Sequence, residues 1–373
     1  MAIIIPMTQP SINRIESLDW LRGLMAISIM LYHYVSWEFA VVPIGTVLGK
    51  LGIYAVSIFF ILSGLSLALV YGDYIKGVKS SIFFLVRRVF RIWPVLWIAV
   101  AIFVVASIYN QKPIDFYTIV LNLTTLFGFI DPSRYISDGA WSIGNEMVYY
   151  AMTPVVILLY NRKLLYGNIF FIFAIIVGLF FSFSQINSQS TLVNEWNNYI
   201  NPFNNLFLFI SGIALYYNLK GLIIKKEINF IFLSMVVLLF VFVDVRGDAI
   251  AITTGINRIF FSAFSIAAVL LFWKSDFDLP KPVKKPWTNI CLAAYPIYLL
   301  HPFILEITKI ATGKIMPVDP FFIISFSVAV TILVSIIIYK FIEKPFIRLG
   351  KKLTLGEDIA SNQPVCRALI IVK

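Results

Sequence analysis

The chain has 373 residues, of which 60% are hydrophobic and 13% are charged, and its formal net charge is +11. Together with a mean hydropathy of +0.89, this composition excludes an ordinary soluble globular protein and indicates a multi-pass protein of the cell (inner or plasma) membrane. Most of the basic excess lies in predicted loops, so we expect a lipid bilayer and no nucleic acid as partner. Two cysteines and two histidines, with no cluster at ligand spacing, predict neither a disulfide framework nor a metal site.

Apolar stretches that could cross a hydrocarbon layer of about 30 Å recur along the chain. They lie at about 20–40, 51–71, 91–109, 146–160, 167–184, 204–217, 228–244, 256–273, 290–310 and 320–342. The predicted fold class is therefore all-α, a polytopic transmembrane bundle of about ten spans. One further apolar stretch, 116–130, is short and lies between Pro113 and "DPSR", so we expect an interfacial or re-entrant segment there.

Lysines and arginines gather in every second connection between the predicted spans. They are Arg14; Lys76, Lys79, Arg87 and Arg88; Arg162 and Lys163; Lys220, Lys225 and Lys226; Lys281, Lys284 and Lys285; and Lys344, Arg348, Lys351 and Lys352. The longest intervening connection, 184–201, has none. By the positive-inside rule both termini are cytoplasmic. We expect one integral membrane domain, 1–350, followed by a short cytoplasmic tail, 351–373.

The first predicted span contains an arginine and a histidine on one helix face. Arg22 and His33 are eleven positions apart, so they return to nearly the same face at a separation of about 16 Å. If Arg22 lies at the cytoplasmic interface, His33 lies near the bilayer midplane, and His301 reaches a comparable depth in the ninth span. A buried imidazole can simply join two helices. Ionisable groups at this depth more often mark a functional site, and the shared face favours that interpretation.

Two further groups of residues carry chemistry. "FLVRRVFRIWPVLW" (84–97) places Arg87, Arg88 and Arg91 where the third span leaves the cytoplasm. Guanidinium groups suit phosphate oxygens, and Arg88 and Arg91 share a helix face, although topology alone also predicts basic residues here. "GAWSIGNEMVYY" (139–150) places Glu146 at the outer entry to the fourth span. That carboxylate could orient an imidazole or bind a hydroxylated substrate.

These motifs together resemble the membrane acyltransferase-3 family, whose members O-acylate exported or surface carbohydrates. The matching residues are Arg22-x10-His33 with "LDWLRG", "FFILSG" (59–64), "RRVFRIWP" (87–94), "WSIGNEMVYY" (141–150), "YPIYLLH" (295–301) and "FIEKPF" (341–346). They follow the family order over nearly the whole chain. Three positions in two motifs depart from the pattern: some relatives carry two adjacent acids where this chain has Asn145 before Glu146, and Ala294 and Pro296 stand where relatives often have serine.

The resemblance implies an O-acyltransferase that uses a cytoplasmic acyl-CoA, usually acetyl-CoA, and no metal. It implies that His33 is essential and that Arg22 and Glu146 act with it. The CoA phosphates would bind Arg87, Arg88 and Arg91. The carbohydrate acceptor, a surface polysaccharide or its lipid-linked precursor, would contact a further set of residues, which consists of Trp141, Ser142, Tyr149 and His301.

Several alternatives remain open at this level. His33 could be the general base for the acceptor hydroxyl, or it could carry the acyl group transiently on nitrogen. Glu146 would orient the imidazole or bind the acceptor, and Arg22 would hold the donor or stabilise developing negative charge. For the donor route we expect a cavity that opens to the cytoplasm beside Arg22, Arg88 and Arg91 and narrows toward His33. The alternative class is a polytopic transporter or a lipid-linked-glycan flippase.

Overall fold

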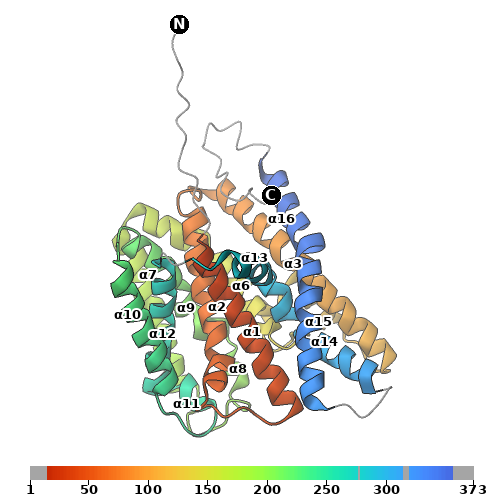
Figure 1. Ribbon diagram of the computed structural model, residues 1–373. Coiled ribbons are helices and arrows are strands. Elements are labelled where there is room, and N and C mark those ends of the chain that lie inside the picture. The colour runs from red at the N-terminus through yellow and green to blue at the C-terminus, as the bar shows by residue number, and fades with distance from the viewer. Residues whose placement is uncertain (1–14, 276–277, 314–318, 356–373) are drawn as a thin grey trace.

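The computed structural model describes residues 15–275, 278–313 and 319–355 (Figure 1), and every regular element among them is helical. The longer helices are α1 (Glu16–Glu38), α2 (Val47–Tyr71), α3 (Val78–Tyr109), α6 (Ala140–Arg162), α7 (Leu164–Phe180), α9 (Pro202–Leu219), α10 (Lys226–Phe242), α12 (Gly255–Trp273), α14 (Ala294–Gly313) and α15 (Pro320–Ile338). The shorter ones are α4 (Phe116–Thr124), α5 (Phe127–Ile130), α8 (Trp196–Tyr199), α11 (Ile250–Thr253), α13 (Lys281–Leu292) and α16 (Lys344–Leu355), with two π-helical turns, η1 (Phe181–Gln185) and η2 (Tyr339–Glu343). The all-α prediction is confirmed for these residues.

Each predicted span overlaps one of the longer helices. Among the described residues, six helical segments could cross a membrane by length and composition: Val47–Tyr71, Val78–Tyr109, Ala140–Arg162, Leu164–Gln185, Gly255–Trp273 and Pro320–Thr354. The count becomes seven if α13 and α14, which meet at a bend of 68°, form one span. The count of about ten, and the cytoplasmic position of both termini, stay predictions.

Two further predictions concern the 116–130 stretch and the start of the predicted tail. Helix α4 has nine residues and α5 has four, so α4 is only about 14 Å long and cannot cross a bilayer. The expectation that 116–130 is not a span is confirmed. Helix α16 continues to Leu355, so the first five residues of the predicted tail extend a helix, and 356–373 lie outside the described residues.

Helices α1 and α2 lie between two groups of helices (Figure 1). On one side are α7, α9, α10 and α12, and on the other are α3, α14, α15 and α16. Helix α2 packs closely against α9 because a glycine of each helix faces the backbone of the other helix. A Cβ on Gly64 would meet the Phe209 carbonyl, and a Cβ on Gly212 would meet the Ile61 carbonyl. The glycine of the "FFILSG" motif therefore allows close approach of two helices.

Two helices begin well before the predicted spans that they contain, in a way that matters for the site. Helix α3 begins at Val78 rather than near residue 91, so Arg87, Arg88 and Arg91 lie well inside a helix. Helix α6 begins at Ala140 rather than near residue 146. Hydropathy finds only the lipid-compatible part of a helix, and it misses turns whose polar side chains contact protein instead of lipid.

The connection before α6 enters the bundle instead of staying at its surface. Ser137 is buried, and its Oγ donates a hydrogen bond to the Leu299 carbonyl at 3.0 Å. Tyr298 OH donates to the Gly139 carbonyl at 2.8 Å, and Gly139 adopts a φ of +89°, which favours glycine. Helix α6 therefore starts deep, against α14, and its first turns lie within the packed interior.

Candidate active site

The two histidines of the chain contact each other. His33 of α1 and His301 of α14 place Nδ1 and Nε2, respectively, 2.8 Å apart, and their rings are nearly parallel. His301 is fully buried, whereas His33 is partly exposed. The sequence predicts a similar depth for the two residues, but not this contact, which depends on how α1 packs against α14.

The hydrogen-bond partners assign the protons of this pair. His301 Nδ1 lies 2.8 Å from the Tyr298 carbonyl, and because a carbonyl only accepts, that nitrogen carries the proton. Nε2 of a neutral His301 is then an acceptor, so His33 Nδ1–H must donate to it. The remaining nitrogen of His33, Nε2, keeps its lone pair.

A proline next to His301 explains why the Tyr298 carbonyl is available. In an α-helix, that carbonyl would accept from the N–H four residues later. The residue at that position is Pro302, inside α14, which has no N–H. The free carbonyl accepts from the His301 ring instead, and the "HP" dipeptide thereby fixes which ring nitrogen is protonated.

Other side chains hold the pair in place. The Trp37 ring stacks on His33 with centroids 4.8 Å apart. Tyr34 OH donates to the His301 carbonyl at 2.8 Å and lies 2.7 Å from Thr331 Oγ1 on α15. Three helices, α1, α14 and α15, therefore meet at the histidine pair and restrict the orientation of both rings.

A second site, the arginine cluster, joins α1, α2, α3, α6 and η2. It comprises Arg22, Arg88, Arg91, Glu146 and Glu343 with their hydroxyl partners. Arg22 forms an ion pair with Asp19 at 2.7 Å and donates to Ser66 Oγ at 3.1 Å. Arg22 and His33 are eleven positions apart on α1, so the cluster lies about 16 Å along that helix from the histidine pair.

The three predicted donor-binding arginines contact different parts of the bundle. Arg88 donates to Tyr71 OH at 2.9 Å and lies over the Tyr150 ring, and Tyr150 is also an electrostatic neighbour of Arg91. Arg88 and Arg91 therefore share a face, as predicted. Arg87 instead contacts α16, where its Nε donates to Thr354 Oγ1 at 2.7 Å. A direct role for Arg87 in donor binding is not supported by this geometry.

Glu146 belongs to the arginine cluster and not to the histidine pair. Its Oε1 accepts hydrogen bonds from Ser63 Oγ and Tyr150 OH, each at 2.5 Å. Glu146 therefore lies inside the bundle beside the arginines and not at the start of its helix, and its role in orienting the His33 imidazole or binding the acceptor stays a prediction. The physical reason for its position is the deep start of α6, which brings Glu146 level with Ser63, sixteen positions after the start of α2 and eight before its end.

Glu343 is a member of the cluster to which the sequence analysis gave no role. It is fully buried in η2, and one of its carboxylate oxygens lies 3.6 Å from Arg91 Nη1. Arg22 is a further electrostatic neighbour. In η2 the Lys344 N–H bonds to the Tyr339 carbonyl, the five-residue step of a π-helix. The available signal was the acid of "FIEKPF", which directly precedes Lys344-Pro345 inside a long apolar helix.

The predicted acceptor-binding residues of α6 are occupied in packing. Trp141 is 5% exposed and packs against Phe60, Trp196 and Tyr199. Ser142 Oγ lies 2.8 Å from Tyr298 OH. Tyr149 is fully buried, and its hydroxyl donates to the Pro202 carbonyl at 2.7 Å. Contact of these residues with a substrate stays a prediction, and His301 contacts His33 rather than open space.

Cavities and possible metal ligands complete the description. The two cavities that we describe are lined by neither His33 nor any member of the arginine cluster, so the donor cavity stays a prediction. Within residues 15–275, 278–313 and 319–355, no three His, Cys, Asp or Glu side chains gather where they could hold a metal ion.

Comparison with known proteins identifies the family. The profile of the acyltransferase domain, acyltransferase-3, matches residues 15–340, which include the histidine pair and most of the arginine cluster. No curated protein and no solved structure matches the chain. Since the profile covers most of the sequence, and since several apolar helices are long enough to cross a bilayer, the chain belongs to the acyltransferase-3 family of membrane acyltransferases.

Proposed function

We propose that this membrane acyltransferase moves an acetyl group from cytoplasmic acetyl-CoA to a hydroxyl of a surface or exported carbohydrate, with His33 Nε2 as the reacting nitrogen. The observation that carries the proposal is the His33–His301 pair. Its hydrogen bonds leave one lone pair, on His33 Nε2, at the end of a chain that runs to the Tyr298 carbonyl. A base or nucleophile held by a second group is the arrangement that acyl transfer requires.

In the direct route, His33 Nε2 accepts the proton of the acceptor hydroxyl while the hydroxyl oxygen attacks the thioester carbonyl carbon. The carbon–sulfur bond breaks, and the imidazolium returns the proton to the CoA thiolate. His301 Nε2 keeps accepting from His33 Nδ1–H throughout and stabilises the imidazolium. His301 is thus a positioning residue in this proposal.

In the two-step route, His33 Nε2 itself attacks the thioester carbonyl carbon and CoA leaves as the thiolate. The acceptor hydroxyl oxygen then attacks the acyl carbon, and the bond between that carbon and Nε2 breaks as the ester forms. The hydroxyl proton passes to the CoA thiolate released in the first step, and His33 regains its lone pair. Both routes use the same nitrogen, and the fixed tautomer favours both equally.

The arginine cluster is suited to bind the donor. Arg88 Nε is buried and has no hydrogen-bond partner among the described residues, so a phosphate oxygen could complete its hydrogen bonding. With phosphates at Arg88 and Arg91, the extended pantetheine arm would have about 16 Å of α1 to follow from Arg22 to His33. The carbohydrate acceptor is inferred from the family resemblance.

The proposal is tested by transfer of label in vesicles. The purified full-length protein is reconstituted in vesicles, with acetyl-CoA labelled in its acetyl group on the membrane side nearer the arginine cluster and a glycan extract on the opposite side. The measured quantity is the alkali-labile label on the glycan. We expect label to appear only with the thioester, and free labelled acetate to give none. Movement of unlabelled glycan across the membrane without any transfer of label would support the transporter alternative instead.

A further inference from the structure

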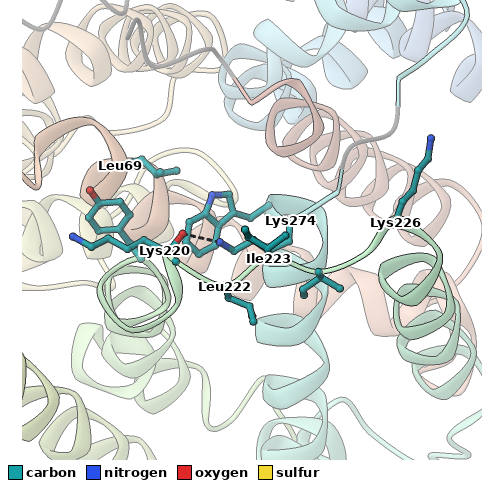
Figure 2. Close-up of a pocket in the computed structure, with 10 residues that line it drawn as sticks. Leu69, Lys220, Leu222, Ile223, Lys226 and Lys274 are labelled. Atoms are coloured by element: carbon teal, nitrogen blue, oxygen red, sulfur yellow. Dashed lines mark hydrogen bonds between the residues drawn. The ribbon is translucent and has the colours of Figure 1, made fainter. Parts of the chain in front are cut away.

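A cavity of about 750 Å³ lies at the end of α2, where Leu69 lines it three positions after Ser66, the partner of Arg22; no member of either site described above lines it. It is formed where α2, α9 and α12 end and α10 begins, and the 220–224 connection lines it (Figure 2). The Lys and Arg distribution predicts that these helix ends face the cytoplasm. Neither the acyl-transfer chemistry nor the family assignment uses this cavity.

Three lysines give the cavity its charge. Lys220, Lys226 and Lys274 all line it, and no lining residue is acidic. Lys274 Nζ donates to the Lys220 carbonyl at 3.2 Å and lies 3.8 Å from the centroid of the Trp273 ring. Among the described residues no carboxylate lies within ion-pair distance of Lys274, and its described contacts are this hydrogen bond and this ring. Figure 2 shows this bond between Lys220 and Lys274 on one side of the view and Lys226 on the other side.

The rest of the lining is mostly apolar, and part of it is exposed. Leu222 is 40% exposed and Ile223 is 92% exposed, although both belong to a short connection between helices. Helix α10, which follows, exposes Phe230 and Ile231. Exposed apolar side chains therefore lie on both the connection and α10 beside the lysines, and a water-soluble anion would leave them uncovered.

We propose that this cavity binds the phosphate headgroup of an anionic phospholipid of the cytoplasmic leaflet, with the acyl chains along Ile223 and α10. The lysines supply the attraction for the phosphate, and the Trp273 ring supplies a flat contact at headgroup depth. Basic pockets between helices on the cytoplasmic side are suited to such headgroups. The inference does not depend on the proposed function, since it involves none of the residues of the histidine pair or the arginine cluster.

The binding test uses the full-length protein in neutral detergent. Binding of phosphatidylglycerol is measured by native mass spectrometry and by the shift of the thermal midpoint, beside phosphatidylcholine with the same acyl chains. Glycerol 3-phosphate, inorganic phosphate and coenzyme A are the soluble probes. We expect saturable binding of phosphatidylglycerol, with little binding of phosphatidylcholine and no stabilisation by glycerol 3-phosphate or phosphate.

Charge-matched variants make the test specific. Lys220→Gln/Lys274→Gln removes two charges from the cavity, and Lys163→Gln/Lys285→Gln removes two exposed charges elsewhere on the same predicted side. At roughly fivefold per lysine, the first variant should bind phosphatidylglycerol about twenty-fivefold more weakly, and the second should bind it like the unaltered protein.

Three results would overturn the proposal. Equal weakening in both double variants would mean that the lysines act only as general surface charge. Stabilisation by inorganic phosphate or glycerol 3-phosphate as strong as that by phosphatidylglycerol would mean a site for soluble anions. Competition by coenzyme A would assign the cavity to the acyl donor.

Discussion

The histidine pair and the arginine cluster place polar groups inside the same bundle in different ways. The histidines are satisfied by each other and by backbone carbonyls of α14, so a single open position remains, on His33 Nε2. The arginine cluster contains more charge but is less complete, because Arg88 Nε and both Glu343 carboxylate oxygens lack hydrogen-bond partners among the described residues. A complete network indicates a group fixed for chemistry, and an incomplete one indicates a place where a ligand supplies the missing partners.

The largest effect is expected at the open position of the histidine pair. His33→Ala should reduce acetyl transfer by about a hundredfold to ten-thousandfold, because the reacting nitrogen is lost. Ser28→Ala is the matched control on α1, since its hydroxyl bonds only to the Leu24 carbonyl of its own helix. Transfer is measured as label on the glycan at equal amounts of folded protein. Substantial residual transfer by well-folded His33→Ala protein would remove His33 from the chemistry.

His301 should give a smaller effect that depends on the substituent. His301→Leu removes the acceptor for His33 Nδ1–H, and we expect kcat to fall about tenfold to a hundredfold with little change in KM for either substrate. His301→Gln retains an acceptor oxygen and should recover part of that loss. If both variants lose activity equally, or if KM for the acceptor rises instead, then His301 contacts substrate as the sequence analysis predicts.

In the arginine cluster the expected effect is on donor affinity. Arg88→Gln should raise KM for acetyl-CoA by about tenfold to a hundredfold, because a hydrogen bond to a charged group contributes about 1.5–3 kcal/mol. The KM for the acceptor should not change. Arg162→Gln, at the exposed end of α6, is the control. An unchanged donor KM in Arg88→Gln would return this arginine to a role in topology and packing.

Glu343 should affect stability more than catalysis. Glu343→Gln leaves Arg91 without its carboxylate neighbour, and we expect a lower thermal midpoint. Combined with Arg91→Gln, the loss should be smaller than the sum of the two single losses, since the residues are partners. Glu306→Gln, which breaks an ion pair with Lys309 at the surface, should change the midpoint little. Additive losses for Glu343 and Arg91 would show that the two side chains do not act as a pair.

The smallest effect is expected in an exposed group of charges outside the bundle. Hydrogen bonds from Thr118 to Asp115 and from Ser133 to Asp131, with Arg134 beside both, lower the pKa of each carboxyl. Groups with lowered pKa stabilise the fold above their unfolded value of about 3.9, and this contribution is lost as the pH falls through the folded value. Limited proteolysis of the 110–139 connection should therefore be constant above about pH 4 and should rise only below it. A transition near neutral pH would contradict this assignment.

Sequence reasoning predicted the components of the site better than their contacts. The spacing of Arg22 and His33 fixes their face and separation, because both lie on one regular helix. The contact between His33 and His301 joins residues 268 positions apart, and no periodicity within either helix specifies it. The family resemblance supplied the motif positions but not which of them meet.

The errors came from places where the backbone departs from a simple span. Hydropathy predicts that the fourth span begins near Glu146, which would place this residue at a membrane surface. In the structure the connection around Ser137 and Gly139 is buried, and α6 therefore begins inside the bundle. The sequence assigns no role to Glu343 because its helix is strongly apolar. Glu343 lies in a π-helical turn just before Pro345, and hydropathy does not reveal such a turn.

The backbone carbonyl that ends the histidine chain has a consequence for how the protein enters the membrane. In a serine hydrolase triad an ionised carboxylate orients the histidine. Here the Tyr298 carbonyl orients His301, and it is available for this hydrogen bond because Pro302 has no N–H to donate to it. An aspartate at the centre of α14 would add about 2.5–3.5 kcal/mol to the free energy of inserting that helix. Because the carbonyl is neutral and already part of the helix, α1 and α14 can be inserted without a charged side chain at this site, and the site assembles when the two helices pack.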